Sequence, residues 1–128
     1  MTITLRVREV LSDPTPFVKG FRLAVDGALL LSEDDFRLYQ LEGDALEEGM
    51  SLWIDDPLAA AKVRDSLPEP PPGGWWYFGR GWVEAWTRRD PDGWVLHEVV
   101  SVWLEESGGE RPVRIAIRPH PWGWDRLL

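Results

Sequence analysis

The chain has 128 residues, 44% of them hydrophobic, which is enough for one domain with a sizeable hydrophobic core. Its net charge of −8 disfavours binding to nucleic-acid phosphates and anionic membranes, and favours basic partners or solubility alone. Without cysteine or an apolar run near the roughly 18 residues of a membrane span, we expect a cytoplasmic protein that has no disulfide, thiolate nucleophile or transmembrane helix.

The first quarter of the chain is typical of short strands. Residues 2–11 alternate apolar and polar side chains, which predicts one half-buried strand. A second alternating run covers residues 17–25. Asp26-Gly27 is a strong two-residue hairpin signal, so we expect the chain to turn back into a strand over residues 28–31.

The next segment opens with four polar residues, 32–35. Ser32 and Asp35 have the spacing of a capping box, so a short helix is one interpretation. We favour an acidic turn followed by a strand over residues 36–41, because glycines soon interrupt the chain. Further turns, the last of them at residues 47–49, would then lead into a strand over 50–54.

One short helix is predicted near residues 57–67. Asp56 stands at the capping position, Pro57 suits the first helical turn, and Pro68 ends the Ala-rich run. The apolar side chains within it recur at helical spacing. We therefore expect a helix that plugs a barrel or lies on a sheet.

A Pro-rich crossover occupies residues 68–74. Such a segment is stiff and could separate two domains, but each half would then have few residues for a core. We interpret it as a connection inside a single domain of residues 1–128. A polyproline ligand for an aromatic groove is the alternative.

The rest of the chain predicts strands over residues 75–89, 94–105 and 113–118, with a turn at residues 90–93. The fold class expected is mainly β (α+β): a small antiparallel barrel or a two-layer β structure of seven to eight strands with one short helix. The helix inserted after several strands is similar to the arrangement of an OB-type barrel, although strand number and spacing fit that fold poorly.

Nine tryptophans are the most informative feature, and all but Trp53 follow the crossover. Large aromatic side chains on both sides of the strand at residues 75–89 imply that both faces are covered, or that one face binds something. We expect one face of that strand and the C-terminal tail to supply an interface. The candidate interface residues are Trp76, Phe78, Trp122 and Trp124.

The turn at residues 90–93 also predicts a pairing. A three-residue loop would set Asp90 opposite Trp94, and Trp86 opposite Glu98. Glu84 and Glu98 would then be diagonal neighbours roughly 7–8 Å apart. The candidate ligand-binding residues of this cleft are Trp82, Glu84, Trp86 and Glu98. A two-residue loop would change the parity and remove the carboxylate pair, and an amphipathic surface of alternating Trp, Glu and Arg is the structural alternative.

No catalytic or cofactor motif is present. The sequence has no Gly-rich phosphate loop and no Gly-x-Ser-x-Gly, and neither His97 nor His120 has a second ligand at metal-binding spacing. We therefore expect no metal, no cofactor and no catalytic residue. A binding domain is expected rather than an enzyme.

Three functions are compatible with these features. The first is a non-enzymatic, soluble binding or protein-interaction domain with an acidic surface, whose partner is a basic protein or a second copy. The alternative is a small-molecule or carbohydrate-binding protein that uses the Trp/Glu cleft. A single-stranded nucleic-acid binder is the third, and the net charge argues against it.

Overall fold

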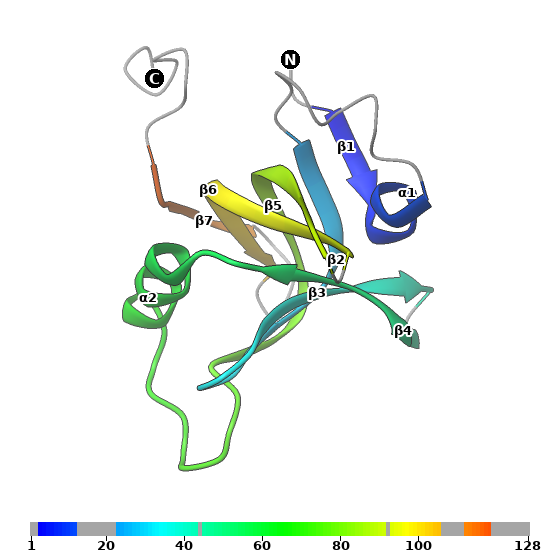
Figure 1. Cartoon of the computed structure of the whole chain (residues 1–128). Coiled ribbons are helices and arrows are strands. Elements are labelled where there is room, and N and C mark those ends of the chain that lie inside the picture. The colour runs from blue at the N-terminus through cyan, green and yellow to red at the C-terminus, as the bar shows by residue number, and fades with distance from the viewer. Residues whose placement is uncertain (1–2, 13–22, 44, 92, 106–111, 119–128) are drawn as a thin grey trace.

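The computed structural model describes residues 3–12, 23–43, 45–91, 93–105 and 112–118. The elements follow the chain in the order β1 (Ile3–Arg6), α1 (Val7–Ser12), β2 (Leu23–Leu31), β3 (Phe36–Glu42), β4 (Ala45–Ile54), α2 (Pro57–Asp65), β5 (Tyr77–Asp90), β6 (Gly93–Glu105) and β7 (Pro112–Ala116) (Figure 1).

Five of the strands close into a barrel in the order β2-β3-β4-β6-β5, with β5 pairing back to β2. All neighbours are antiparallel except β4 and β6, which run parallel. The helix α2 is inserted between the third and fourth barrel strands. This strand order and helix placement are those of an OB-type barrel. The predicted mainly β barrel is confirmed. The prediction that strand number and spacing would fit an OB-type barrel poorly is wrong.

The prediction about the OB-type barrel failed because the sequence analysis divided β2 into two shorter strands. The strand runs without a break through Asp26 and Gly27, so the predicted hairpin is wrong. Gly27 lies opposite Gly81 of β5, and a Cβ on Gly27 would lie 2.4 Å from the carbonyl oxygen of Tyr39. The glycine therefore permits close approach of neighbouring strands rather than a turn.

The predicted strand over residues 2–11 is half correct. It ends at Arg6, and α1 follows at once. Val7 and Val10 are fully buried and Leu11 packs against the core, which is the i, i+3, i+4 spacing of a helix face. The prediction extended the strand too far, because the two-residue alternation of residues 3–6 was taken to continue past Val7, where the spacing of buried residues becomes helical.

Two local predictions around β3 and β4 had different outcomes. The acidic turn at 32–35 is confirmed: the Ser32 N–H donates to the Asp35 carbonyl oxygen, and the Asp35 N–H donates to the Ser32 hydroxyl. The expected turn at 47–49 is wrong. These residues lie within β4, where the pairing with β3 shifts register between Tyr39 and Gln40.

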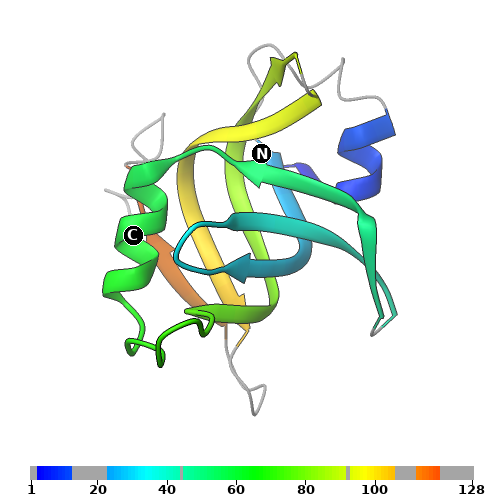
Figure 2. The same cartoon turned by 60° about the horizontal axis from the view of Figure 1, so that its bottom comes forward.

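The predicted helix is confirmed as α2, which ends two residues earlier than expected. Asp56 caps it by accepting the Ala59 N–H at 3.2 Å, and Pro57 occupies the first turn. The helix lies beside β7 in both views, where the Lys62 ammonium donates to the Ile117 carbonyl oxygen (Figure 2).

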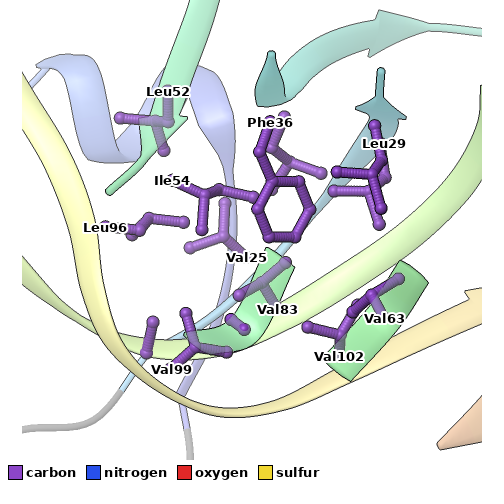
Figure 3. Close-up of a cluster of buried hydrophobic side chains, with 14 of the residues drawn as sticks. Val25, Leu29, Phe36, Leu52, Ile54, Val63, Val83, Leu96, Val99 and Val102 are labelled. Carbon is purple, nitrogen blue, oxygen red and sulfur yellow. The ribbon is translucent and has the colours of Figure 1, made fainter. Parts of the chain in front are cut away.

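The hydrophobic core fills the barrel and extends beneath α2. Side chains from every barrel strand and from α2 converge there (Figure 3). The labelled members are Val25, Leu29, Phe36, Leu52, Ile54, Val63, Val83, Leu96, Val99 and Val102. Two strands extend the barrel: β1 pairs parallel with β2, and β7 pairs antiparallel with the C-terminal part of β6.

Candidate functional site

The predicted cleft residues of β5 lie on the outside of the barrel. Val83, Ala85 and Thr87 are buried on its inner face, whereas Trp82, Glu84 and Trp86 are half-buried. The expected division of this part of the strand between two faces is confirmed.

The predicted pairing with β6 is wrong. The turn holds two residues, so Asp90 pairs with Gly93, and Trp86 faces His97 rather than Glu98. The register then shifts between Glu84 and Trp86, where β6 contributes more residues than β5. Glu98 lies in this bulge with φ of 46°.

The two-residue turn and this register shift together separate the two predicted carboxylates. Glu84 pairs with Ser101 and accepts a hydrogen bond from its hydroxyl at 2.9 Å, whereas Glu98 is exposed. Trp82 faces Trp103, and the two rings stack with centroids 5.4 Å apart. Trp82 thus packs against a ring of the neighbouring strand.

An open groove of about 780 Å³ lies at the other end of β5, and we call it the apolar groove. It lies between the C-terminal end of α2 and the strands β5, β6 and β7. Its lining residues are Ser66, Leu67, Tyr77, Phe78, Gly79, Arg80, Leu104, Glu105, Val113 and Ile115.

One predicted interface residue, Phe78, lines the apolar groove and is 48% exposed. Strand alternation would place Trp75 on the face opposite Phe78, but Trp75 is 58% exposed and its ring centroid lies 4.8 Å from that of Phe78. It precedes β5, so the two-residue period does not apply to it. Trp76 is half-buried and packs against the core, and Trp122 and Trp124 lie outside the described residues.

Tyr77 shapes the floor of the apolar groove. Its hydroxyl lies 2.6 Å from the carbonyl oxygen of Arg80 and 3.0 Å from that of Glu105. Burial and the nearby Glu105 charge raise the pKa of Tyr77 and outweigh its hydrogen bond, so the hydroxyl stays neutral and can donate. The ring therefore holds the start of β5 against the end of β6.

The charges that line the apolar groove are balanced. Arg80 and Glu105 are both exposed, and the Arg80 Nε lies 3.9 Å from the Glu105 carboxylate. Arg80 also contacts Asp26 at 3.4 Å. An apolar hollow with one positive and one negative rim residue suits a protein surface better than a small charged ligand.

A second cavity, which we call the Trp53 cavity, has a volume of about 410 Å³ and lies where β3, β4 and the start of β6 meet. The Arg37 guanidinium lies 4.9 Å from the Trp53 ring centre and donates to Asp35 and Ser51. The sequence analysis missed this site, because Trp53 stood apart from the other tryptophans.

A buried ion pair joins α2 to the strands beside it. The Asp56 carboxylate accepts from the Val99 N–H at 2.8 Å and from the Arg118 guanidinium at 2.5 Å. Burial by itself raises the pKa of Asp56, but the hydrogen bonds from Arg118, Val99 and Ala59 outweigh burial and hold that pKa below 3.8. Because its acceptors are occupied, this carboxylate has a structural rather than a chemical role.

No three His, Cys, Asp or Glu side chains gather as metal ligands within the described ranges. In the same residues, no helix is long and apolar enough to cross a membrane. No protein-family model, curated protein or solved structure matches the chain. Its function must therefore be argued from its own surface.

Proposed function

We propose that the protein is a non-enzymatic interaction domain that docks another protein chain in the apolar groove. The observation that carries this proposal is the convergence of exposed apolar side chains. Phe78 and Val113 line one hollow, and the Trp75 ring packs against the Phe78 ring. These three are among the four large apolar side chains that the described surface exposes. Aromatic residues around a hollow are typical of the anchoring centre of an interface.

Covering the exposed rings supplies a substantial driving force. Trp and Phe side chains bury roughly 150–250 Å² when fully covered, so about 100 Å² of each ring remains to be covered here. At about 25 cal/mol per Å², each ring favours association by about 2.5 kcal/mol. The loss of translational and rotational freedom offsets part of this gain.

The net charge of −8 is the second support for a protein partner. A strongly acidic chain attracts basic surfaces from a distance and accelerates their encounter. A basic hetero-partner would associate more slowly as salt screens the attraction. The rate of a partner without opposite charge would change little or increase.

Site-specific photo-crosslinking tests this proposal. A benzophenone amino acid replaces Phe78 in the full chain, and the same amino acid replaces Leu58 as the control. Leu58 is 45% exposed and does not line the apolar groove. We expect one defined protein adduct from position 78 after irradiation in the producing cells, and none of that mass from position 58. Equal adducts from both positions, or none from position 78, would contradict the proposal.

A second candidate function is the binding of a carbohydrate or another small molecule. The Trp53 cavity favours it, because an aromatic ring, a guanidinium and a hydroxyl converge there. The cleft predicted at Trp82, Glu84, Trp86 and Glu98 is a different location for the same function.

Tryptophan fluorescence titrated against a panel of glycans distinguishes the two locations. A response that Trp53→Phe abolishes and Trp86→Phe preserves would support the Trp53 cavity. The reverse result would support the predicted cleft. A wild-type protein that does not respond would count against carbohydrate binding.

A further inference from the structure

We infer that the apolar groove receives an extended segment of another protein, which pairs along the outer edge of β7 and lengthens the sheet by one strand. This inference rests on the proposed function, because it names the conformation and the side-chain pattern of the partner for the same groove. The segment carries apolar side chains at every second position, since neighbouring side chains of a strand point to opposite faces.

The direction of the main-chain groups of β7 is the first argument. Within the described residues, β7 pairs with β6 and with no other strand, so it is the outermost strand on this side of the barrel (Figure 1). The Ile117 N–H donates to the Val100 carbonyl oxygen. Hydrogen-bonded and non-hydrogen-bonded pairs alternate along antiparallel strands, so the N–H and C=O of Ala116 point away from β6. By the same alternation the Pro112 carbonyl points away from β6. Groups that point outward from an edge strand are a template for a further strand.

The position of the apolar groove beside this edge is the second argument. Val113 and Ile115 line the groove from β7. A strand added to β7 lies about 4.8 Å from it, and the side chains on its groove face stand next to Val113 and Ile115. Val113 is 39% exposed although it is apolar, so the added strand would cover it. Main-chain bonds and a receptor for alternate apolar side chains therefore coincide, as strand addition requires.

The two ends of β7 limit the length of the pairing. Pro112 has no N–H, so it offers an added strand only its carbonyl oxygen. Directly beyond Ala116, the Ile117 carbonyl oxygen accepts from the Lys62 ammonium of α2. The paired stretch is therefore short, and most of the specificity comes from the side chains that enter the groove.

The net charge of the chain indicates which kind of protein supplies the strand. Two copies of charge −8 repel each other, which opposes pairing of β7 with a second copy. Within the groove lining, Arg80 and Glu105 lie beside each other and balance. The strand therefore comes from a different protein, with apolar residues in the groove and basic residues to either side of them.

Selection of peptides on the full chain tests the inference. The probe is a displayed library of random peptides, and we expect the selected sequences to have apolar residues at every second position. One selected peptide is then synthesised in two forms, each N-methylated on alternate amides, which removes N–H donors without changing side chains. One form should bind about tenfold more weakly, because its methyl groups face β7. The other form should bind nearly as well as the unmodified peptide.

Variants of β7 test the same pairing from the side of the protein. Ala116→Pro removes the outward N–H and leaves the pairing with β6 in place, so it should weaken the peptide about fivefold. Ala116→Thr keeps the N–H and suits a strand, so this matched control should bind like the wild type. Val113→Glu should abolish binding, because a charge would then stand in the groove. Circular dichroism verifies each fold, and the N-methylated peptides decide the question even if Ala116→Pro does not fold.

Hydrogen exchange of the unbound chain tests whether the edge of β7 is available. We expect the Ala116 amide to exchange much faster than the Ile115 amide, which faces β6, and to become protected when the selected peptide binds. An Ala116 amide that is as slow as that of Ile115 in the unbound monomer would overturn the inference, because the chain would then cover its own edge. Protection that appears only at high protein concentration would also overturn it, in favour of a second copy.

The outcomes separate this inference from the proposed function. Position 78 could crosslink to a partner while no peptide is selected, or while the peptides have helical spacing or ignore both the N-methyl groups and Ala116→Pro. Strand addition would then be wrong and the interaction domain would stand. If no peptide is selected and position 78 gives no adduct, both fail.

Discussion

Replacing Asp56 by alanine is expected to destabilise the fold more than any other single change outside the barrel interior. The carboxylate is 3% exposed, and four donors reach it: the N–H groups of Ala59 and Val99, and two nitrogens of the Arg118 guanidinium. It therefore holds the start of α2, the bulge of β6 and the segment after β7 together.

The magnitude follows from these bonds. Loss of the helix cap costs about 1 kcal/mol. Leaving the buried Val99 N–H without an acceptor costs about 1–3 kcal/mol. Removing one partner of a buried ion pair costs about 3–5 kcal/mol in total, and less where the partner is accessible to water, as Arg118 is at 34% exposure. We expect about 4 kcal/mol for Asp56→Ala, or a fall of about 15 °C in Tm.

Asp56→Asn is the matched control. It retains one oxygen, which can accept from the Ala59 N–H or the Val99 N–H but not from both, and it removes the charge that faces Arg118. We therefore expect a loss of about 2–3 kcal/mol. The pH dependence has a defined sign. The pKa of Asp56 is lowered in the folded protein, so its contribution is complete above about pH 4 and declines as the pH falls through that lowered value. The difference between wild type and Asp56→Asn should therefore shrink below pH 4.

Urea denaturation followed by circular dichroism measures these free energies of unfolding, and thermal melts measure the Tm. The reasoning is refuted if Asp56→Ala costs less than about 1 kcal/mol. It is also refuted if Asp56→Asn is as destabilising as Asp56→Ala at neutral pH, since the charge and the hydrogen-bond acceptors would then be inseparable.

Two further predictions concern the barrel. The stacked rings of Trp82 and Trp103 should give an exciton couplet in the far-ultraviolet circular dichroism spectrum. Trp82→Phe should abolish this couplet and cost about 1 kcal/mol, while Trp86→Phe preserves it. Gly27→Ala should cost about 2–3 kcal/mol in urea denaturation, because its Cβ would lie 2.4 Å from a carbonyl oxygen of β3. The control Gly49→Ala, whose Cβ would meet nothing within 4 Å, should cost less than about 0.5 kcal/mol.

Local chemistry allowed the sequence to predict several features correctly. The burial of Val83, Ala85 and Thr87 on the inner face of β5 follows from strand geometry, in which alternate side chains point to opposite faces. The start of α2 follows from a cap and a proline, which act on neighbouring residues only. The acidic turn before β3 is of the same kind.

The candidate site could be predicted only in part. Phe78 was recognised as an interface candidate because large aromatic residues are costly to expose. The hollow beside it combines α2 with three strands that are distant in sequence, so no spacing along the chain signals it. The prediction of the Glu84–Glu98 pair failed because the turn holds two residues rather than three, which changes the parity of the pairing, and the bulge at Glu98 shifts the register again beyond it.

The sequence by itself determined that most of the chain is extended, where α2 begins, and that aromatic residues exceed what a small core needs. Only the tertiary structure decided that β2 continues through Asp26-Gly27, that β4 meets β6 to close the barrel, and that Phe78, with the Trp75 ring packed against it, lines an open groove. The physical reason is that propensity and periodicity act over a few residues. Register, closure and surface shape depend on packing between strands far apart in the chain, where one inserted residue or one missing Cβ changes the result.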